Sequence, residues 1–132
     1  MIRLKPRVRI LMNRVKDFTD LLAWQNAHEL ALGLYKISQQ FPKSETYGIV
    51  DQLRRAAVSV TLNIAEGFGR FHFKDKVRFY YLSRGSLKEV QSLLILVKDL
   101  KYINNERYHD LFTQSVVTEQ LLNGLIRVNK NN

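Results

Sequence analysis

Basic side chains are the groups in this 132-residue chain whose number and spacing could do chemistry. Eight arginines and lysines fall between residues 54 and 88, a stretch with only two acidic residues. Guanidinium and ammonium groups at this density repel one another, and phosphates neutralise them well. The pattern therefore predicts electrostatic binding of a nucleic-acid backbone. The candidate residues are Arg54, Arg55, Arg70, Lys74, Lys76, Arg78, Arg84 and Lys88.

A second basic zone lies at the N-terminus, where residues 1–16 hold six basic residues and no acidic one. Apolar and basic side chains alternate there, and a two-residue period favours an extended segment. The apolar set is Ile2, Leu4, Val8 and Ile10, and the basic set is Arg3, Lys5, Arg7 and Arg9. We interpret residues 1–17 as a basic arm whose charged set also binds nucleic acid. The alternatives are a disordered tail or a chain that starts at Met12.

Constellations typical of catalysis or metal binding are missing from the sequence. His28, His72 and His109 lie outside any Glu-x-x-His pair or HExxH motif. The Gly67-Phe68-Gly69 segment is too short for a phosphate-binding loop, and no lysine-serine pair follows it. We therefore expect no enzymatic activity, no catalytic residue, no metal and no cofactor.

The composition also indicates in which cellular compartment the protein is expected. Cysteine is absent, which excludes disulfides and fits a reducing cytoplasm. No run of 18 or more apolar residues is present, and the first 16 residues lack the features of a signal peptide. The sequence predicts a cytoplasmic protein with no membrane partner.

Hydrophobic periodicity predicts an all-α domain over residues 18–132. Four helices are expected at about 21–40, 46–68, 74–101 and 105–128. Their short connections favour an antiparallel up-down-up-down bundle. We expect Thr19 or Asp20 to cap the first helix and Asn104 the fourth. Gly67-Phe68-Gly69 should end the second helix in a left-handed conformation.

Apolar side chains at three- and four-residue spacing predict the buried faces. For the second helix these are Val50, Leu53, Ala57, Val60 and Ile64. For the third they are Phe79, Leu82, Ser86, Val90, Leu93, Val97 and Leu100.

Several other residues of these two helices are expected to serve contacts between helices or between subunits. Gly85 should allow close approach of a neighbouring helix, and Tyr80 and Tyr81 are expected at a subunit interface. Ser59, Asn63 and Glu66 are interpreted as a structural flank that hydrogen-bonds to a neighbouring helix or subunit, and Glu66 is placed to pair with Arg70.

Several segments match a known family. They are Phe18-Thr-Asp-Leu-Leu-Ala-Trp24, Gln52-Leu-Arg-Arg-Ala-Ala-Val-Ser59, Asn63-Ile-Ala-Glu-Gly-Phe-Gly-Arg70 and Arg84-Gly-Ser-Leu87. Over about residues 18–126 the chain resembles the bacterial four-helix bundle proteins first met as reading frames inside intervening sequences of 23S rRNA genes. The resemblance implies an up-and-down bundle that assembles into a ring-like homopentamer. It also implies kinship with the accessory variability-determinant proteins of diversity-generating retroelements, which bind nucleic acid and a reverse transcriptase.

Two hypotheses about function follow. The first is a non-enzymatic homopentamer that binds RNA or DNA backbone and supports a reverse transcriptase or an rRNA-linked process. The alternative is a structural scaffold whose basic face docks an acidic protein partner.

Overall fold

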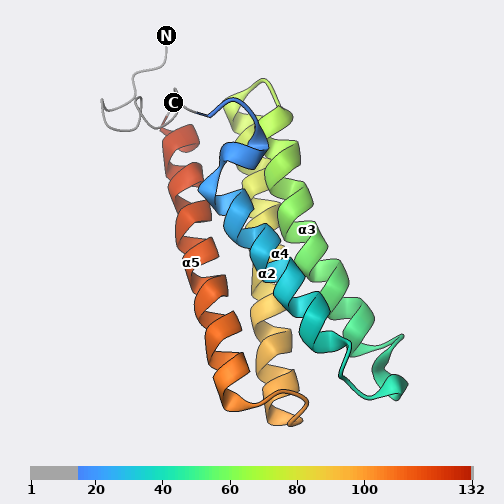
Figure 1. Cartoon of the computed structure of the whole chain (residues 1–132). Helices are drawn as coiled ribbons and strands as arrows, with labels where there is room; N and C mark the ends of the chain where they lie inside the picture. Colours follow the sequence, from blue (N-terminus) through green and yellow to red (C-terminus); the bar gives the residue numbers. More distant parts are fainter. Residues whose placement is uncertain (1–14, 132) are drawn as a thin grey trace.

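The computed structural model describes residues 15–131, and every regular element within that range is helical. The structure has four α-helices that pack side by side, and the colours of Figure 1 show that each runs opposite to the one before it. The prediction of an all-α four-helix bundle is confirmed. Most of the predicted arm, residues 1–14, lies outside the described residues. The elements are η1 (Phe18–Asp20), α2 (Leu22–Ser38), η2 (Lys43–Glu45), α3 (Ile49–Gly69), α4 (Phe73–Asp99) and α5 (Asn105–Lys130).

The N-terminal cap of α5 was predicted correctly, and that of α2 was not. Asn104 caps α5 as predicted, because its side chain accepts a hydrogen bond from the Arg107 backbone N–H at 2.7 Å. The prediction that Thr19 or Asp20 caps the first helix is wrong. Asp20 instead closes η1 by accepting from the backbone N–H groups of Lys16 and Asp17, and these bonds lower its pKa. Helix α2 begins after Leu21 without a side-chain cap.

The end of α3 also differs from the prediction. The helix continues through Gly69, and no glycine among residues 15–131 has a positive φ. The left-handed ending is therefore wrong. The terminal carbonyls of α3 are satisfied from α4, since Lys76 Nζ donates to the Phe68 oxygen at 2.6 Å. The left-handed residue in the described range is Lys101, with φ 63°, in the turn between α4 and α5.

The buried face of α3 is the predicted one, and all five of its seam residues are buried. The predicted face of α4 is correct at Val90 and Val97, which are fully buried, but wrong by about one position in the first half of the helix. Tyr80, Ser83 and Leu87 are buried, whereas Leu82 is 51% exposed. The buried face of α4 includes polar residues, so the spacing of apolar residues alone did not indicate it. The Ser83 hydroxyl, for example, donates to the Val60 carbonyl oxygen at 2.7 Å, so Ser83 is buried with its polar group hydrogen-bonded.

Close approach between α3 and α4 occurs at Gly67 rather than at Gly85. A Cβ on Gly67 would lie 2.7 Å from the Tyr80 ring, whereas a Cβ on Gly85 would meet nothing within 4 Å. Tyr80 is thus buried inside the bundle, not at a subunit interface, and burial raises its pKa to about 12. The Ser59 and Ser86 hydroxyls, 2.7 Å apart, join the same two helices, in agreement with the structural interpretation of Ser59.

None of the helices in residues 15–131 combines the length and the apolar character that crossing a bilayer requires.

Candidate nucleic-acid interface

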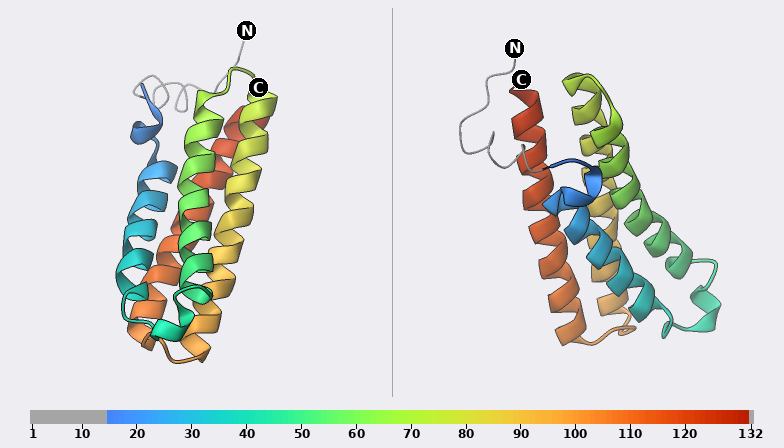
Figure 2. Two further views of the ribbon diagram at one scale, coloured as in Figure 1. Left: turned by 90° about the vertical axis from the view of Figure 1, so that its right-hand side faces the viewer. Right: turned by 45° about the horizontal axis from the view of Figure 1, so that its top comes forward.

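Three of the eight predicted basic residues lie at the α3–α4 end of the bundle. Arg70 follows α3, while Lys74 and Arg78 lie one turn apart at the start of α4. The Arg70 guanidinium carbon lies 4.6 Å from the centroid of the Phe79 ring, and that of Arg78 lies 4.9 Å from it. Both views in Figure 2 place this end of the bundle beside the C-terminal end of α5. Phe79, expected in the core, is half-buried and serves as a shared platform for two guanidinium groups.

We call Arg70, Phe71, Lys74 and Arg78 the tip cluster. Phe71 is 88% exposed, although an exposed aromatic ring gains nothing from water. The Lys74 ammonium group makes no hydrogen bond or ion pair with any residue from 15 to 131, and its side chain is exposed. It also lies four residues before Arg78, a spacing at which like charges on a helix repel. The cluster therefore offers cations for phosphate oxygens and a ring on which a nucleic-acid base could stack.

One member of the tip cluster has an acidic neighbour. Arg70 Nη2 bonds to Glu66 Oε1 at 2.6 Å, the pairing that the sequence predicted. Both side chains remain substantially exposed, so the pair contributes little stability and leaves the guanidinium within reach of a ligand.

Two other predicted residues, Arg84 and Lys88, face α5 instead. Arg84 Nη1 donates to Asn123 Oδ1 at 3.1 Å, and Lys88 Nζ lies 3.0 Å from Glu119 Oε1. Partial burial alone would raise the pKa of Glu119. Hydrogen bonds from Lys88 and Gln91, with the nearby positive charges, outweigh that effect and lower it. This pair therefore joins two helices of the bundle.

Arg54 and Lys76 also make contacts within the bundle. Arg54 Nε donates to Ser38 Oγ at 2.9 Å, and its guanidinium lies 4.6 Å from the Tyr35 ring centroid. Lys76 binds the end of α3, and burial lowers its pKa. Both side chains tie neighbouring helices together.

The last of the eight, Arg55, pairs with Asp51 at 2.9 Å on the surface. It precedes Arg70 by fifteen residues, or roughly 22 Å along α3. The structure thus separates Arg55 from the tip cluster. The arm candidates Arg3, Lys5, Arg7 and Arg9 lie outside the described residues.

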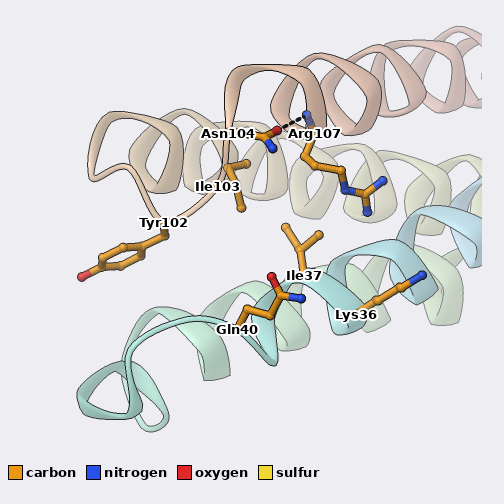
Figure 3. Close-up of a pocket in the computed structure, with 7 residues that line it drawn as sticks. All are labelled: Lys36, Ile37, Gln40, Tyr102, Ile103, Asn104 and Arg107. Carbon is orange, nitrogen blue, oxygen red and sulfur yellow. Dashed lines mark hydrogen bonds between the residues drawn. The ribbon is translucent and has the colours of Figure 1, made fainter.

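A hollow of about 400 Å³ lies at the opposite end of the bundle, between α2 and the turn that leads into α5. In Figure 3, Ile37 and Ile103 face each other across it, while Tyr102 points away. Lys36 and Arg107 also line it but do not converge on one point in that view. Across residues 15–131 no three His, Cys, Asp or Glu side chains gather as a metal site would require. The tip cluster is therefore the stronger candidate interface.

Comparison with known proteins bears on this bundle. Residues 19–124 match the family model described as 23S rRNA-intervening sequence protein. The chain belongs to that family. A similar solved structure is a protein of unknown function from the S23 ribosomal protein family of Bacteroides thetaiotaomicron, with a TM-score of 0.72. The two chains are 20% identical, and the match covers 80% of this chain and 99% of the other. At that identity the likeness shows a shared fold and nothing more. None of the curated proteins matches the sequence.

Proposed function

We propose that this family member is a non-enzymatic, cytoplasmic homo-oligomer that binds RNA or DNA backbone through the tip cluster. The observation that carries the proposal is that Arg70 and Arg78 share the Phe79 ring, while exposed Lys74 lies one turn before Arg78 and exposed Phe71 directly follows Arg70. Each cation can displace a condensed counterion from a phosphate, and this release drives binding that depends little on sequence.

Assembly into a pentamer would multiply this interface. A second copy can cover apolar surface, and Leu62 on α3 and Leu82 on α4 are 61% and 51% exposed. Five linked tip clusters would bind one nucleic-acid strand more tightly than a single cluster, because the later contacts become intramolecular.

An accessory role in a reverse-transcriptase-dependent or rRNA-linked process fits such binding. A protein that holds RNA by its backbone can serve many sequences, as an accessory to a templated reaction must. The family's connection with intervening sequences of 23S rRNA supports this context.

The test measures binding of a mixed-sequence RNA by fluorescence anisotropy over a salt series. The variant Arg70→Glu/Lys74→Glu/Arg78→Glu should lose binding while its oligomer mass is unchanged. The control, Lys36→Glu/Lys43→Glu/Lys101→Glu, makes the same change in net charge with three exposed lysines away from the tip. It should keep most of the affinity, because long-range charge is screened within about 10 Å at 0.1 M salt.

Equal losses in the two triple variants would show that net charge alone governs binding and would overturn the tip as the site. If the unmodified oligomer binds no RNA at low salt, the nucleic-acid proposal is wrong. The basic face would then be better explained as a docking surface for an acidic protein.

A further inference from the structure

An apolar cleft of about 660 Å³ opens at the same end of the bundle as the tip cluster. It lies among the start of α2, the start of α4 and the last turns of α5. Apolar side chains dominate its walls, among them Leu21, Phe73, Leu121 and Leu125. Clefts of roughly 300–1,000 Å³ are the usual size of binding sites in proteins. This one could therefore hold several apolar side chains.

The chain itself enters the described structure at this cleft. Val15, the first described residue, is half-buried, packs against the core and lines the cleft. An extended chain spans at most about 3.3–3.6 Å per residue, so residues 8–12 lie within roughly 25 Å of this point. Every wall of the cleft is within their reach.

The sequence before Val15 has the pattern that such a cleft would accept. Every even-numbered position from 2 to 12 is apolar, and four of the intervening positions are basic. In an extended segment successive side chains point to opposite sides, so the even positions form one apolar edge. That set is Ile2, Leu4, Pro6, Val8, Ile10 and Met12.

We propose that the cleft is the docking site for residues 8–12 of the same chain. Val8, Ile10 and Met12 fill it, and Arg7 and Arg9 face solvent. Docking removes apolar surface of both the arm and the cleft from water, which favours the bound state by about 25 cal/mol for each Å². The arm's charges are then held beside the tip cluster. The inference concerns contacts within the chain and does not depend on nucleic-acid binding.

A spin label locates the arm directly. The sequence has no cysteine, so Arg9→Cys provides a single attachment site for a nitroxide on the solvent-facing side of the arm. Methyl resonances of Leu21, Leu121 and Leu125 should broaden strongly. Those of Ile37 and Ile103, at the opposite end of the bundle, should stay sharp. Broadening of both groups alike, or of neither, would overturn the proposal.

A mixed sample separates docking within one chain from exchange between copies. Isotope-labelled protein without the nitroxide is mixed, unfolded and refolded with unlabelled protein that carries it. Docking within one chain predicts cleft signals far sharper than in the singly modified sample. Equal broadening in the mixture would overturn the proposal, because the occupant would then be the arm of a second copy.

Paired arm variants test which side chains fill the cleft. Without nucleic acid, Ile10→Ser/Met12→Ser should raise the fluorescence of an apolar dye such as ANS, which reports exposed hydrophobic surface. The matched change Arg7→Ser/Arg9→Ser should leave the fluorescence at its unmodified level. Equal responses of the two pairs would show that apolar docking does not occupy the cleft.

Discussion

Helix α4 carries two pairs of basic residues at the same four-residue spacing, and the fold uses them differently. Lys74 and Arg78 stand at the end of the bundle with no acidic partner among residues 15–131. Arg84 and Lys88, about three turns further on, face α5 and bond to Asn123 and Glu119. The two pairs look alike in sequence. What separates a binding surface from a packing contact is the residue that the neighbouring helix places opposite.

The difference between the two pairs is also one of environment. Glu119 accepts hydrogen bonds from both Lys88 and Gln91, and Gln91 in turn donates to the buried Ser115 hydroxyl. The second pair is therefore continuous with the bundle interior. In the first pair, the Arg78 guanidinium carbon lies 4.9 Å from the centroid of the half-buried Phe79 ring, and Lys74 is exposed. Arg84 and Lys88 already donate to Asn123 and Glu119, whereas within residues 15–131 the side chains of Lys74 and Arg78 donate to no acceptor.

The largest expected effect comes from neutralising each pair in turn. At 50 mM salt, counterion release contributes roughly 8-fold for each phosphate contact with a single strand, so two lost contacts weaken RNA binding about 65-fold. We expect this for Lys74→Gln/Arg78→Gln, with little change in the melting temperature. Arg84→Gln/Lys88→Gln should lower the melting temperature and leave the salt dependence of binding nearly unchanged. Anisotropy and thermal unfolding on the same samples measure both. If the two variants lose affinity equally, the contrast between the pairs does not exist.

The next effect tests what holds the tip cluster in place. Gly67→Ala would put a Cβ 2.7 Å from the Tyr80 ring and 3.1 Å from the Lys76 carbonyl oxygen. Overpacking of this kind destabilises by about 1–3 kcal/mol. We expect a lower midpoint in urea unfolding, together with weaker RNA binding because the start of α4 is displaced.

Gly85→Ala is the matched control. That position is open, so the change should stabilise the helix by up to about 1 kcal/mol. A Gly67→Ala protein as stable as the unmodified one would show that the contact relaxes easily and does not position the tip.

The buried face of α3 could be predicted from the sequence, whereas the contrast between the two basic pairs could not. The α3 seam was predictable because its apolar residues form one clean stripe. On α4, apolar residues lie on two neighbouring faces, so the sequence pattern fits burial of Phe79 and Leu82 as well as burial of Tyr80 and Leu87. The buried face also includes the polar Gln91, which a pattern of apolar residues does not indicate. The role of the eight basic residues in binding nucleic acid stays a prediction. Their separation into free and bonded sets was not predictable, since it depends on the register between α4 and α5.

A smaller effect concerns the bonded pair and pH. The folded-state pKa of Glu119 is lowered, so its stabilising contribution is complete above its ordinary value near 4.5. That contribution is lost as the pH falls through the folded-state pKa. Glu119→Gln should therefore cost about 1 kcal/mol at pH 7 and make the melting temperature less sensitive to acid below pH 4.5. Glu89→Gln changes an exposed carboxylate on α4 and serves as the control. If the two variants show the same acid profile, Glu119 gains nothing from its bonds.

The smallest effect separates stability from binding altogether. Lys101 holds a left-handed conformation, φ 63°, at the far end of α4 from the tip cluster. Glycine adopts this conformation without the steric penalty of a side chain, so Lys101→Gly should stabilise the protein by about 0.5–1 kcal/mol. RNA affinity should not change, because neither basic pair is touched. Thermal unfolding and anisotropy on the same sample decide the matter. A gain in affinity that accompanied the gain in stability would mean that the rigidity of the bundle, and not the free charges of Lys74 and Arg78, limits binding.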